Sequence, residues 1–386
     1  MSRKLKIGVI GMGAQGSHYA SILNQEKGDY ILSALSSRSE DKREYFNKLY
    51  PTIPYFFDWK DLINSNTVEA VIIATTNSTH PLIASYAIKK GIHVLLDKPT
   101  ALHYKAAKEL NNIADQHPAV VFGAIYQRRT NSVYQRVKEI VETNELGNLR
   151  KNLMISTAWW RPDKYYSQSV SRGTWGGEGG GVLINQALHQ LDIWQWICGM
   201  PNKLYANVQL GLYREVEIEN DVTIISEYKN GVTGCFITTA YDPLGIDRFE
   251  LTFDKGKIVI EGVGEKATLY RLKTSETEMN KEMPLEGVKD FIQGKAVDNL
   301  YTTEVITCSE KWAEQHHLTI QNFVSKVLNN TKLLIPGKEG INSLELVNAA
   351  LMSGFTRSEI ALPIDGDKYL EKLNELIKNE GLFEPL

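Results

Sequence analysis

The feature that most constrains the fold of this chain is a glycine pattern near its N-terminus. A short apolar run, Lys6 to Ile10, leads directly into Gly11-Met12-Gly13-Ala14-Gln15-Gly16, and a helical pattern follows. In this spacing the first glycine allows a tight turn, the second lets the backbone approach a pyrophosphate, and the third lets the helix pack closely on the strand. The free N–H groups at the start of the helix then bind phosphate. The pattern predicts a site for a dinucleotide.

The first third of the chain alternates short apolar runs with segments of helical length. The predicted strands are Lys6 to Ile10, Tyr30 to Leu35, Ala70 to Ala74, His93 to Leu96 and Ala119 to Gly123, and the predicted helices include Pro81 to Lys90 and Tyr104 to Gln116. Apolar strands separated by helices are typical of a parallel, doubly wound sheet. Residues 1–125 are therefore predicted to form an α/β Rossmann domain that binds NAD(P).

The pattern changes beyond residue 125. Strands with period-two alternation are predicted at Leu204 to Leu210, Val222 to Tyr228 and Thr233 to Thr239, and Asn230-Gly231 predicts a hairpin between the last two. Residues 126–386 are expected to form an α+β domain on a mostly antiparallel sheet. Helices predicted at His317 to Leu328 and Ser343 to Arg357 are assigned to this domain or to its contact with the first.

Composition narrows the partners. The net charge of -3 provides no basic stripe, so nucleic acid is not expected as a partner. Cys198, Cys235 and Cys308 lack the spacing of a metal site or a disulfide framework, and we expect reduced, buried thiols. No apolar run reaches the ~20 residues that span a bilayer, and the first strand begins too early for a signal peptide. We therefore expect a cytoplasmic protein with no membrane contact and no bound metal.

The end of the second predicted strand bears on the choice of cofactor. The stretch Ser36-Ser37-Arg38 has no carboxylate before Glu40 to hold the ribose 2′-hydroxyl of NAD. A hydroxyl at Ser37 followed by the guanidinium of Arg38 suits a 2′-phosphate. NADP is therefore favoured, and NAD remains the alternative if Arg38 is simply a solvated residue.

A second group of polar residues follows the sequence Gly179-Gly180-Gly181. In a helix predicted from about Leu183 to Cys198, Asn185, His189 and Asp192 share one face. Asp192 is expected to cap or pair with nearby backbone, and a metal site is not expected because no third ligand follows. Lys98 ends a predicted parallel strand, where such sheets bind ligands.

These motifs together resemble the glucose–fructose oxidoreductase and inositol dehydrogenase (Gfo/Idh/MocA) family along nearly the whole chain. The resemblance implies that the second domain is built on a large open sheet and that substrate binds between the domains. It implies that Lys98, in Asp97-Lys98-Pro99, is the catalytic lysine and that His189 is the acid/base. Asp97 stands where the family has glutamate, and Asn185 where it has aspartate. An amide orients an imidazole or binds a hydroxyl, but it does not neutralise an imidazolium.

The resemblance also assigns further residues. Thr75, Asn77, His80 and Asp97 are expected beside the cofactor, and Arg172 and Trp175 fall where the family places a nicotinamide-contacting pair, with Ser171 in place of its tryptophan. Rings and cations suited to carbohydrate complete the candidate substrate site. They are Tyr126, Arg128, Trp160, Arg161 and Tyr165, together with Trp175, Asn185 and His189.

The predicted function is hydride transfer between NAD(P) and a secondary alcohol of a sugar, polyol or sugar derivative. Lys98 would stabilise the developing alkoxide and His189 would accept its proton. One alternative is a glycoside hydrolase or isomerase that reduces and recycles bound NAD, and another is a non-catalytic NAD(P)-binding regulator. The family resemblance implies a homodimer or homotetramer formed through the open sheet.

Overall fold

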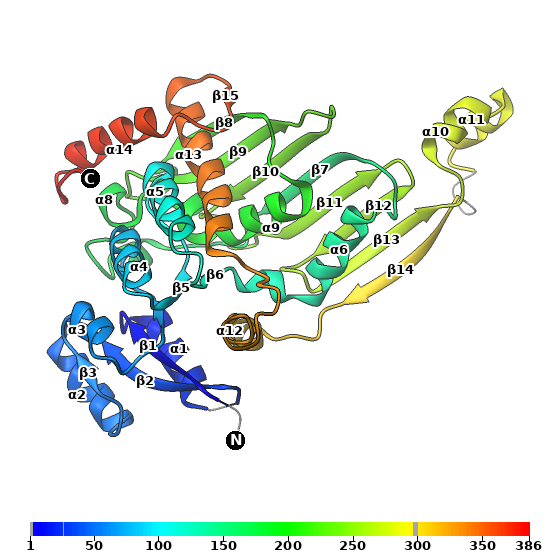
Figure 1. Cartoon of the computed structure of the whole chain (residues 1–386). Coiled ribbons are helices and arrows are strands. Elements are labelled where there is room, and N and C mark those ends of the chain that lie inside the picture. Colours follow the sequence, from blue (N-terminus) through cyan, green and yellow to red (C-terminus); the bar gives the residue numbers. More distant parts are fainter. Residues whose placement is uncertain (1–2, 26, 296–299) are drawn as a thin grey trace.

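A computed structural model describes residues 3–25, 27–295 and 300–386 and contains two sheets (Figure 1). The first sheet is parallel throughout, in the order β3-β2-β1-β4-β5-β6. Its strands are β1 (Leu5–Ile10), β2 (Tyr30–Ser36), β3 (Tyr55–Phe56), β4 (Ala70–Ile73), β5 (His93–Asp97) and β6 (Phe122–Ile125). This is the strand order of a dinucleotide-binding Rossmann fold, which confirms the predicted α/β class.

Helices pack on both faces of this sheet. They are α1 (Ala14–Asn24), α2 (Glu40–Leu49), α3 (Trp59–Asn64), α4 (His80–Lys89), α5 (Tyr104–Asp115) and α12 (Trp312–Asn329). The helix α12 comes from the C-terminal third of the chain, yet Ile320, Phe323 and Val324 are buried in one core with the strand β1. The C-terminal part of the chain therefore completes the N-terminal fold. The boundary between residues 1–125 and 126–386 stays a prediction.

The second sheet is larger and mostly antiparallel, in the order β14-β13-β12-β11-β7-β10-β9-β8-β15. Its strands are β7 (Leu149–Ser156), β8 (Lys203–Leu210), β9 (Glu219–Glu227), β10 (Thr233–Thr239), β11 (Asp247–Phe253), β12 (Gly256–Glu261), β13 (Lys266–Leu272), β14 (Tyr301–Thr307) and β15 (Ile360–Ala361). Among the described strands of this second sheet, only β7 and β10 pair in parallel. The predicted open α+β sheet is confirmed.

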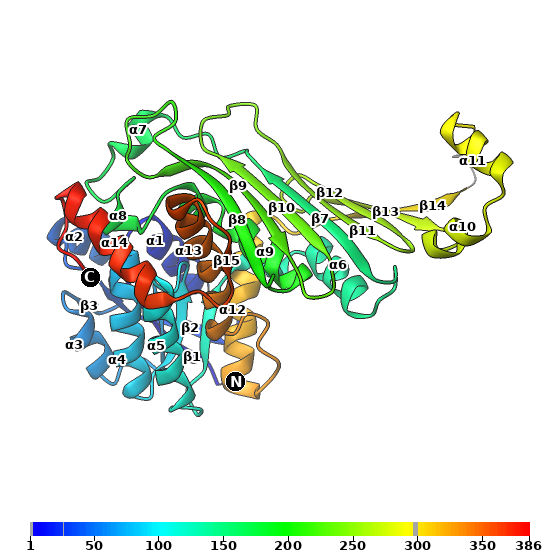
Figure 2. The same cartoon turned by 90° about the horizontal axis from the view of Figure 1, so that it is seen from above.

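One face of this sheet packs on helices and the other is open (Figures 1 and 2). The remaining helices are α6 (Ser132–Glu142), α7 (Asp163–Tyr166), α8 (Trp175–Glu178), α9 (Leu188–Cys198), α10 (Glu276–Glu282), α11 (Leu285–Ile292), α13 (Gly340–Thr356) and α14 (Gly366–Glu380). On the open face Tyr205 and Ile225 lie opposite each other across β8 and β9 and are 42% and 54% exposed. The helices α10 and α11 project beyond the end of the sheet, far from the first domain (Figure 2).

The strand predicted at Ala119 to Gly123 is displaced to β6, because the Val120 N–H closes a turn on the His117 carbonyl before the strand begins. The cysteines are free, as predicted, but only partly buried. In the part of the chain that the structure describes, no helix is long and apolar enough to cross a membrane.

Candidate active site

The glycine turn after β1 has the geometry that a dinucleotide requires. Gly11 has φ of +94°, and a Cβ there would lie 2.5 Å from the Ala74 carbonyl oxygen. At Gly16 a Cβ would lie 1.8 Å from the Gly11 carbonyl oxygen, so close packing of helix and strand demands glycine. A Cβ at Gly13 would meet nothing within 4 Å, and α1 begins next without a side-chain cap. Open space beside uncapped N–H groups fits the pyrophosphate of NAD(P).

A cavity of about 370 Å³ lies between this turn and the start of α2. It is lined by Met12, Gly13, Ala14, Ser17, Asp41, Lys42, Tyr45 and Phe46. Gln15 is exposed on the first turn of α1, and Ser37 and the exposed Arg38 lie between β2 and α2. Asp41 and Lys42, one acidic and one basic, were not singled out from the sequence. Their position in the first turn of α2 was the available signal.

The residues after β4 join the first sheet to the glycine-rich segment before α9. The Asn77 side chain donates to the Glu178 carbonyl (3.3 Å), and Thr79 donates to the Thr75 hydroxyl (2.7 Å). The buried His80 ring lies between two carbonyl oxygens, with Nδ1 2.7 Å from that of Pro99 and Nε2 3.2 Å from that of Thr75. Burial lowers the pKa of His80 to about 4. These contacts support the turn that carries Lys98, and direct contact of Thr75, Asn77 and His80 with cofactor stays a prediction.

Lys98 lies at the carboxyl end of β5, and its ammonium reaches into the second domain. Its Nζ donates to the Asn185 carbonyl oxygen at 2.7 Å, and burial lowers its pKa. Asp97 accepts bonds from the Lys98 backbone N–H (2.9 Å) and from the Tyr19 hydroxyl (3.2 Å). Burial raises the pKa of Asp97 to about 6, although the Lys98 charge opposes this shift. The parts of the candidate site from the two domains therefore meet at Lys98.

The helix predicted from Leu183 to Cys198 is interrupted, and that prediction is wrong in this respect. Val182–Gln186 form a π-helix, and α9 begins after Ala187. The buried Glu219 of β9 holds the start of the π-helix by accepting the N–H groups of Gly181 (2.6 Å) and Leu183 (3.0 Å). Asn185 and His189 therefore do not lie on one continuous α-helical face.

His189 is at the start of α9, close to Lys98. Burial lowers its pKa well below the ordinary value, and the positive charges of Lys98 and Arg128 lower it further. Its Nδ1 is buried and has no hydrogen-bond partner among the described residues. The Tyr126 ring meets the imidazole edge-to-face, with centroids 6.3 Å apart. A neutral imidazole with an unpaired nitrogen is able to accept a proton from a bound hydroxyl.

An aromatic and cationic group lies beside Asn185. The guanidinium carbons of Arg172 and Arg161 lie 4.4 and 5.0 Å from the centre of the Tyr165 ring, and Tyr165 lies 3.4 Å from the Asn185 amide nitrogen. Arg128 lies 5.8 Å from the Trp159 ring. Two other predicted substrate residues differ in exposure: Trp160 is 48% exposed, whereas Trp175 is 2% exposed and packs on Phe355. Their role in substrate binding stays a prediction.

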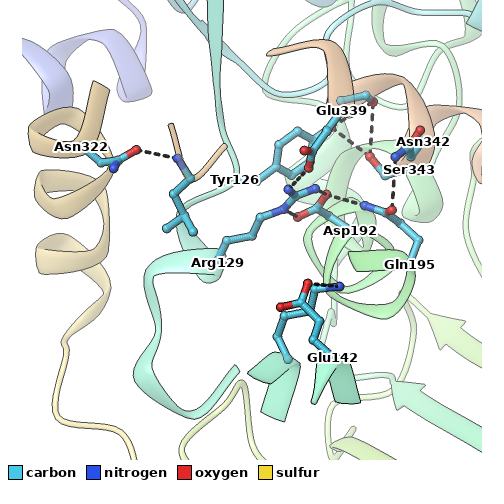
Figure 3. A network of polar contacts seen from close by, with 12 residues as sticks. Tyr126, Arg129, Glu142, Asp192, Gln195, Asn322, Glu339, Asn342 and Ser343 are labelled. Carbon is cyan, nitrogen blue, oxygen red and sulfur yellow. Dashed lines mark hydrogen bonds and ion pairs between the residues drawn. The ribbon is translucent and has the colours of Figure 1, made fainter. Parts of the chain in front are cut away.

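A buried ion pair fixes α9 and was missed by the sequence reading (Figure 3). Arg129 donates to both carboxylate oxygens of Asp192, at 2.8 and 2.6 Å, and also pairs with Glu339. Burial lowers the pKa of the Arg129 guanidinium, but the two carboxylates together outweigh it and raise this pKa above its ordinary value. The partner of Asp192 is therefore a side chain 63 positions away rather than nearby backbone. Tyr126 joins the same region through the Ser343 hydroxyl at 3.0 Å.

Glu178 is the other missed residue. Its carboxylate accepts from the Asn185 amide (2.7 Å) and from the Gly173 N–H (2.9 Å), and burial raises its pKa. An acidic residue directly before three glycines was the only available signal. Within the described ranges no group of three or more His, Cys, Asp or Glu side chains is arranged to hold a metal ion.

Comparison with known proteins adds to this geometry. Residues 5–124 match the family model described as an oxidoreductase family with an NAD-binding Rossmann fold, and residues 134–259 match the GFO/IDH/MocA C-terminal domain. Myo-inositol 2-dehydrogenase of Thermotoga maritima is 24% identical over 266 residues, which are 68% of this chain and 76% of that protein.

Two further relatives cover almost the whole chain. The scyllo-inositol 2-dehydrogenase (NADP(+)) IolW of Bacillus subtilis is 22% identical over 382 residues, 93% of this chain and 96% of that protein. The WlbA dehydrogenase of Bordetella pertussis, solved with NADH and UDP-GlcNAcA, has a TM-score of 0.75 at 21% identity and covers 94% of this chain and 100% of that chain. The structural likeness establishes a shared fold.

Proposed function

The chain belongs to the GFO/IDH/MocA oxidoreductase family, and on that premise we propose that it is an NAD(P)-dependent dehydrogenase of a sugar, polyol or sugar derivative. The observation that carries this proposal is the contact between Lys98 of the first domain and the segment of the second domain that contains Asn185 and His189. Lys98 donates to the Asn185 carbonyl oxygen (2.7 Å), and its charge affects the pKa of His189. The pair lies where doubly wound sheets bind ligands, at the carboxyl ends of the strands.

In this proposal Lys98 and His189 act on the same substrate hydroxyl group, each in a different role. A bound nicotinamide supplies the hydride acceptor or donor. The Lys98 ammonium stabilises negative charge on the substrate oxygen, and the neutral His189 imidazole accepts the hydroxyl proton. Asn185 positions the ammonium through its carbonyl oxygen. Its side chain orients the substrate or the imidazole.

We favour NADP as the cofactor, with NAD as the alternative. Support comes from Ser37 and the exposed Arg38 between β2 and α2, and from Lys42 in the adjoining cavity. Cationic side chains near a ribose suit a 2′-phosphate. Asp41 lines the same cavity and is the residue that would serve the ribose hydroxyl of NAD.

We place the substrate against Tyr165 and its two arginines. An aromatic ring suits the CH face of a sugar or polyol, and guanidinium groups bind its hydroxyls or a carboxylate. Arg161 and Arg172 lie within 5.0 Å of the Tyr165 ring centre. The exposed apolar residues Tyr205 and Ile225 on the open sheet support a homodimer or homotetramer.

The test is to follow nicotinamide absorbance with NADP and NAD across inositols, aldoses, ketoses and sugar acids. We expect turnover with one substrate class and a loss on the order of 10²-fold or more in kcat for Lys98→Met. Lys105→Met is the matched control, since Lys105 is an exposed lysine paired with Asp367. Absence of turnover across the panel would refute a dehydrogenase with net cofactor turnover. Nucleotide that then co-purified with the protein would favour a recycled cofactor.

A further inference from the structure

The Lys98 ammonium is largely buried, so the charged groups around it decide whether the amine stays protonated. Burial lowers its pKa, and Arg128 and Arg161 lower it further. The two carboxylates that oppose this shift are Asp97 and Glu178. His189, which also lies close, is held neutral by burial and adds no negative charge. The balance of charge at Lys98 therefore depends on two acids.

Asp97 is poorly placed to do this alone. One of its oxygens already accepts bonds from the Lys98 backbone N–H and the Tyr19 hydroxyl. Burial also raises its pKa to about 6, so the cost of holding its negative charge is high. It belongs to the same strand end as Lys98 and cannot fix the direction in which the long lysine side chain points.

Glu178 reaches Lys98 through Asn185. The Glu178 carboxylate accepts from the side-chain amide N–H of Asn185 at 2.7 Å, and the backbone carbonyl oxygen of Asn185 accepts from Lys98 Nζ at 2.7 Å. A carboxylate can only accept, so it fixes the side-chain amide of Asn185 with its nitrogen toward Glu178, and this contact helps to hold the residue whose backbone oxygen binds Lys98. The Gly173 N–H holds the second oxygen of Glu178 at 2.9 Å. Each oxygen of the Glu178 carboxylate therefore accepts one hydrogen bond, and the two bonds fix its orientation.

From this chain of contacts we infer that Glu178 is a positioning residue that supplies the negative counter-charge for Lys98 and holds Asn185 in its working orientation. The inference rests on the proposed function, because it assumes that Lys98 serves the reaction as an ammonium. Asn185 is neutral, and it binds Glu178 through its side chain and Lys98 through its backbone carbonyl oxygen, so a carboxylate lies one hydrogen bond from the Asn185 side chain. Removal of the Glu178 charge should let the Lys98 ammonium lose its proton at a lower pH, without disturbing the nucleotide site.

The test uses isosteric changes of charge in the full chain. Glu178→Gln removes the charge but keeps the shape. The double variant Glu178→Gln, Asn185→Asp moves the charge across the same hydrogen bond. Glu217→Gln is the matched control, because Glu217 is exposed on the loop before β9. The apparent pKa of Lys98 is measured by competitive labelling with acetic anhydride across pH and mass spectrometry of the Lys98 peptide.

We expect Glu178→Gln to lower the apparent pKa of Lys98 by about one unit or more and kcat by about tenfold or more. The affinity for NADPH should stay unchanged. The double variant should recover both quantities, and Glu217→Gln should change neither. If a negative charge at position 185 restores the Lys98 pKa and kcat, the role of Glu178 is electrostatic rather than merely structural.

Two results would overturn the inference. One is an unchanged Lys98 titration in Glu178→Gln, and the other is a folded double variant that recovers neither the titration nor kcat. The labelling needs no substrate. If the wild-type chain turns over nothing in the panel, the proposed function fails while the charge relation between Glu178 and Lys98 is still tested by the titration.

Discussion

Replacement of Gly13 by alanine should separate nucleotide binding from the stability of the fold. Gly13 precedes α1 with φ of -77° and ψ of -162°, values open to any L-residue, and a Cβ there meets no atom within 4 Å. The chain itself therefore accommodates alanine. Because the unfolded chain loses freedom, we expect stability to rise by about 0.4–1 kcal/mol.

The same methyl group should obstruct a bound pyrophosphate. Overpacking of one methyl group costs about 1–3 kcal/mol, which corresponds to about 5- to 150-fold weaker binding at ~1.4 kcal/mol per tenfold change. NADPH titration by calorimetry and thermal unfolding of the same samples measure the two effects. Gly16→Ala is the contrast, because its Cβ would lie 1.8 Å from the Gly11 oxygen and should lower both stability and affinity. Wild-type affinity in Gly13→Ala would refute the assigned pyrophosphate position.

Three further outcomes are expected. Asp192→Leu should destabilise the chain by about 3–5 kcal/mol, because it leaves buried Arg129 without its main partner. Addition of Arg129→Met should restore most of the lost stability. Equal urea midpoints for the wild-type chain, the single variant and the double variant would contradict this. His80 is buried with its pKa lowered from 6.5 to about 4, so the unfolded chain binds more protons in that window and stability should fall by ~1.4 kcal/mol per pH unit from about pH 6.5 toward 4. Melting curves at several pH values should show a shallower acid slope for His80→Gln, and an unchanged slope would count against the assignment. Arg38→Asp should weaken NADP binding about tenfold or more and leave NAD binding intact, whereas equal losses for both nucleotides would mean that Arg38 does not distinguish them.

Local pattern was sufficient for much of this fold. The glycine turn, the strand β1, which is apolar except for Lys6, the uniformly apolar strand β4 and the Asn230-Gly231 hairpin are each set by neighbours within a few residues. Such features can be predicted because turn geometry and strand alternation depend on backbone conformation and on side chains close in sequence. Lys98 and His189 were predicted from the family resemblance that their flanking motifs carry, and their catalytic roles stay predictions.

The tertiary structure alone decided how these residues act together. The apolar repeat that predicts a helix cannot distinguish a π-helix from an α-helix, and Glu219, 38 positions after Gly181, holds the π-helix in place. The helix α12 joins the first domain because its apolar face matches the core of a sheet some 300 residues earlier in the chain, a fit that no local pattern encodes.

The sequence by itself therefore determined the class of fold, which depends on short-range pattern, and it predicted the two central side chains from the motifs that flank them. The electrostatic state of the site was decided only when the chain folded. Glu178 is hydrogen-bonded to the side chain of Asn185. The backbone of Asn185 is in turn hydrogen-bonded to Lys98, which lies 87 positions earlier in the chain. Coulomb interactions act through space and strengthen where burial removes water, so the charge on Lys98 is a property of the folded site.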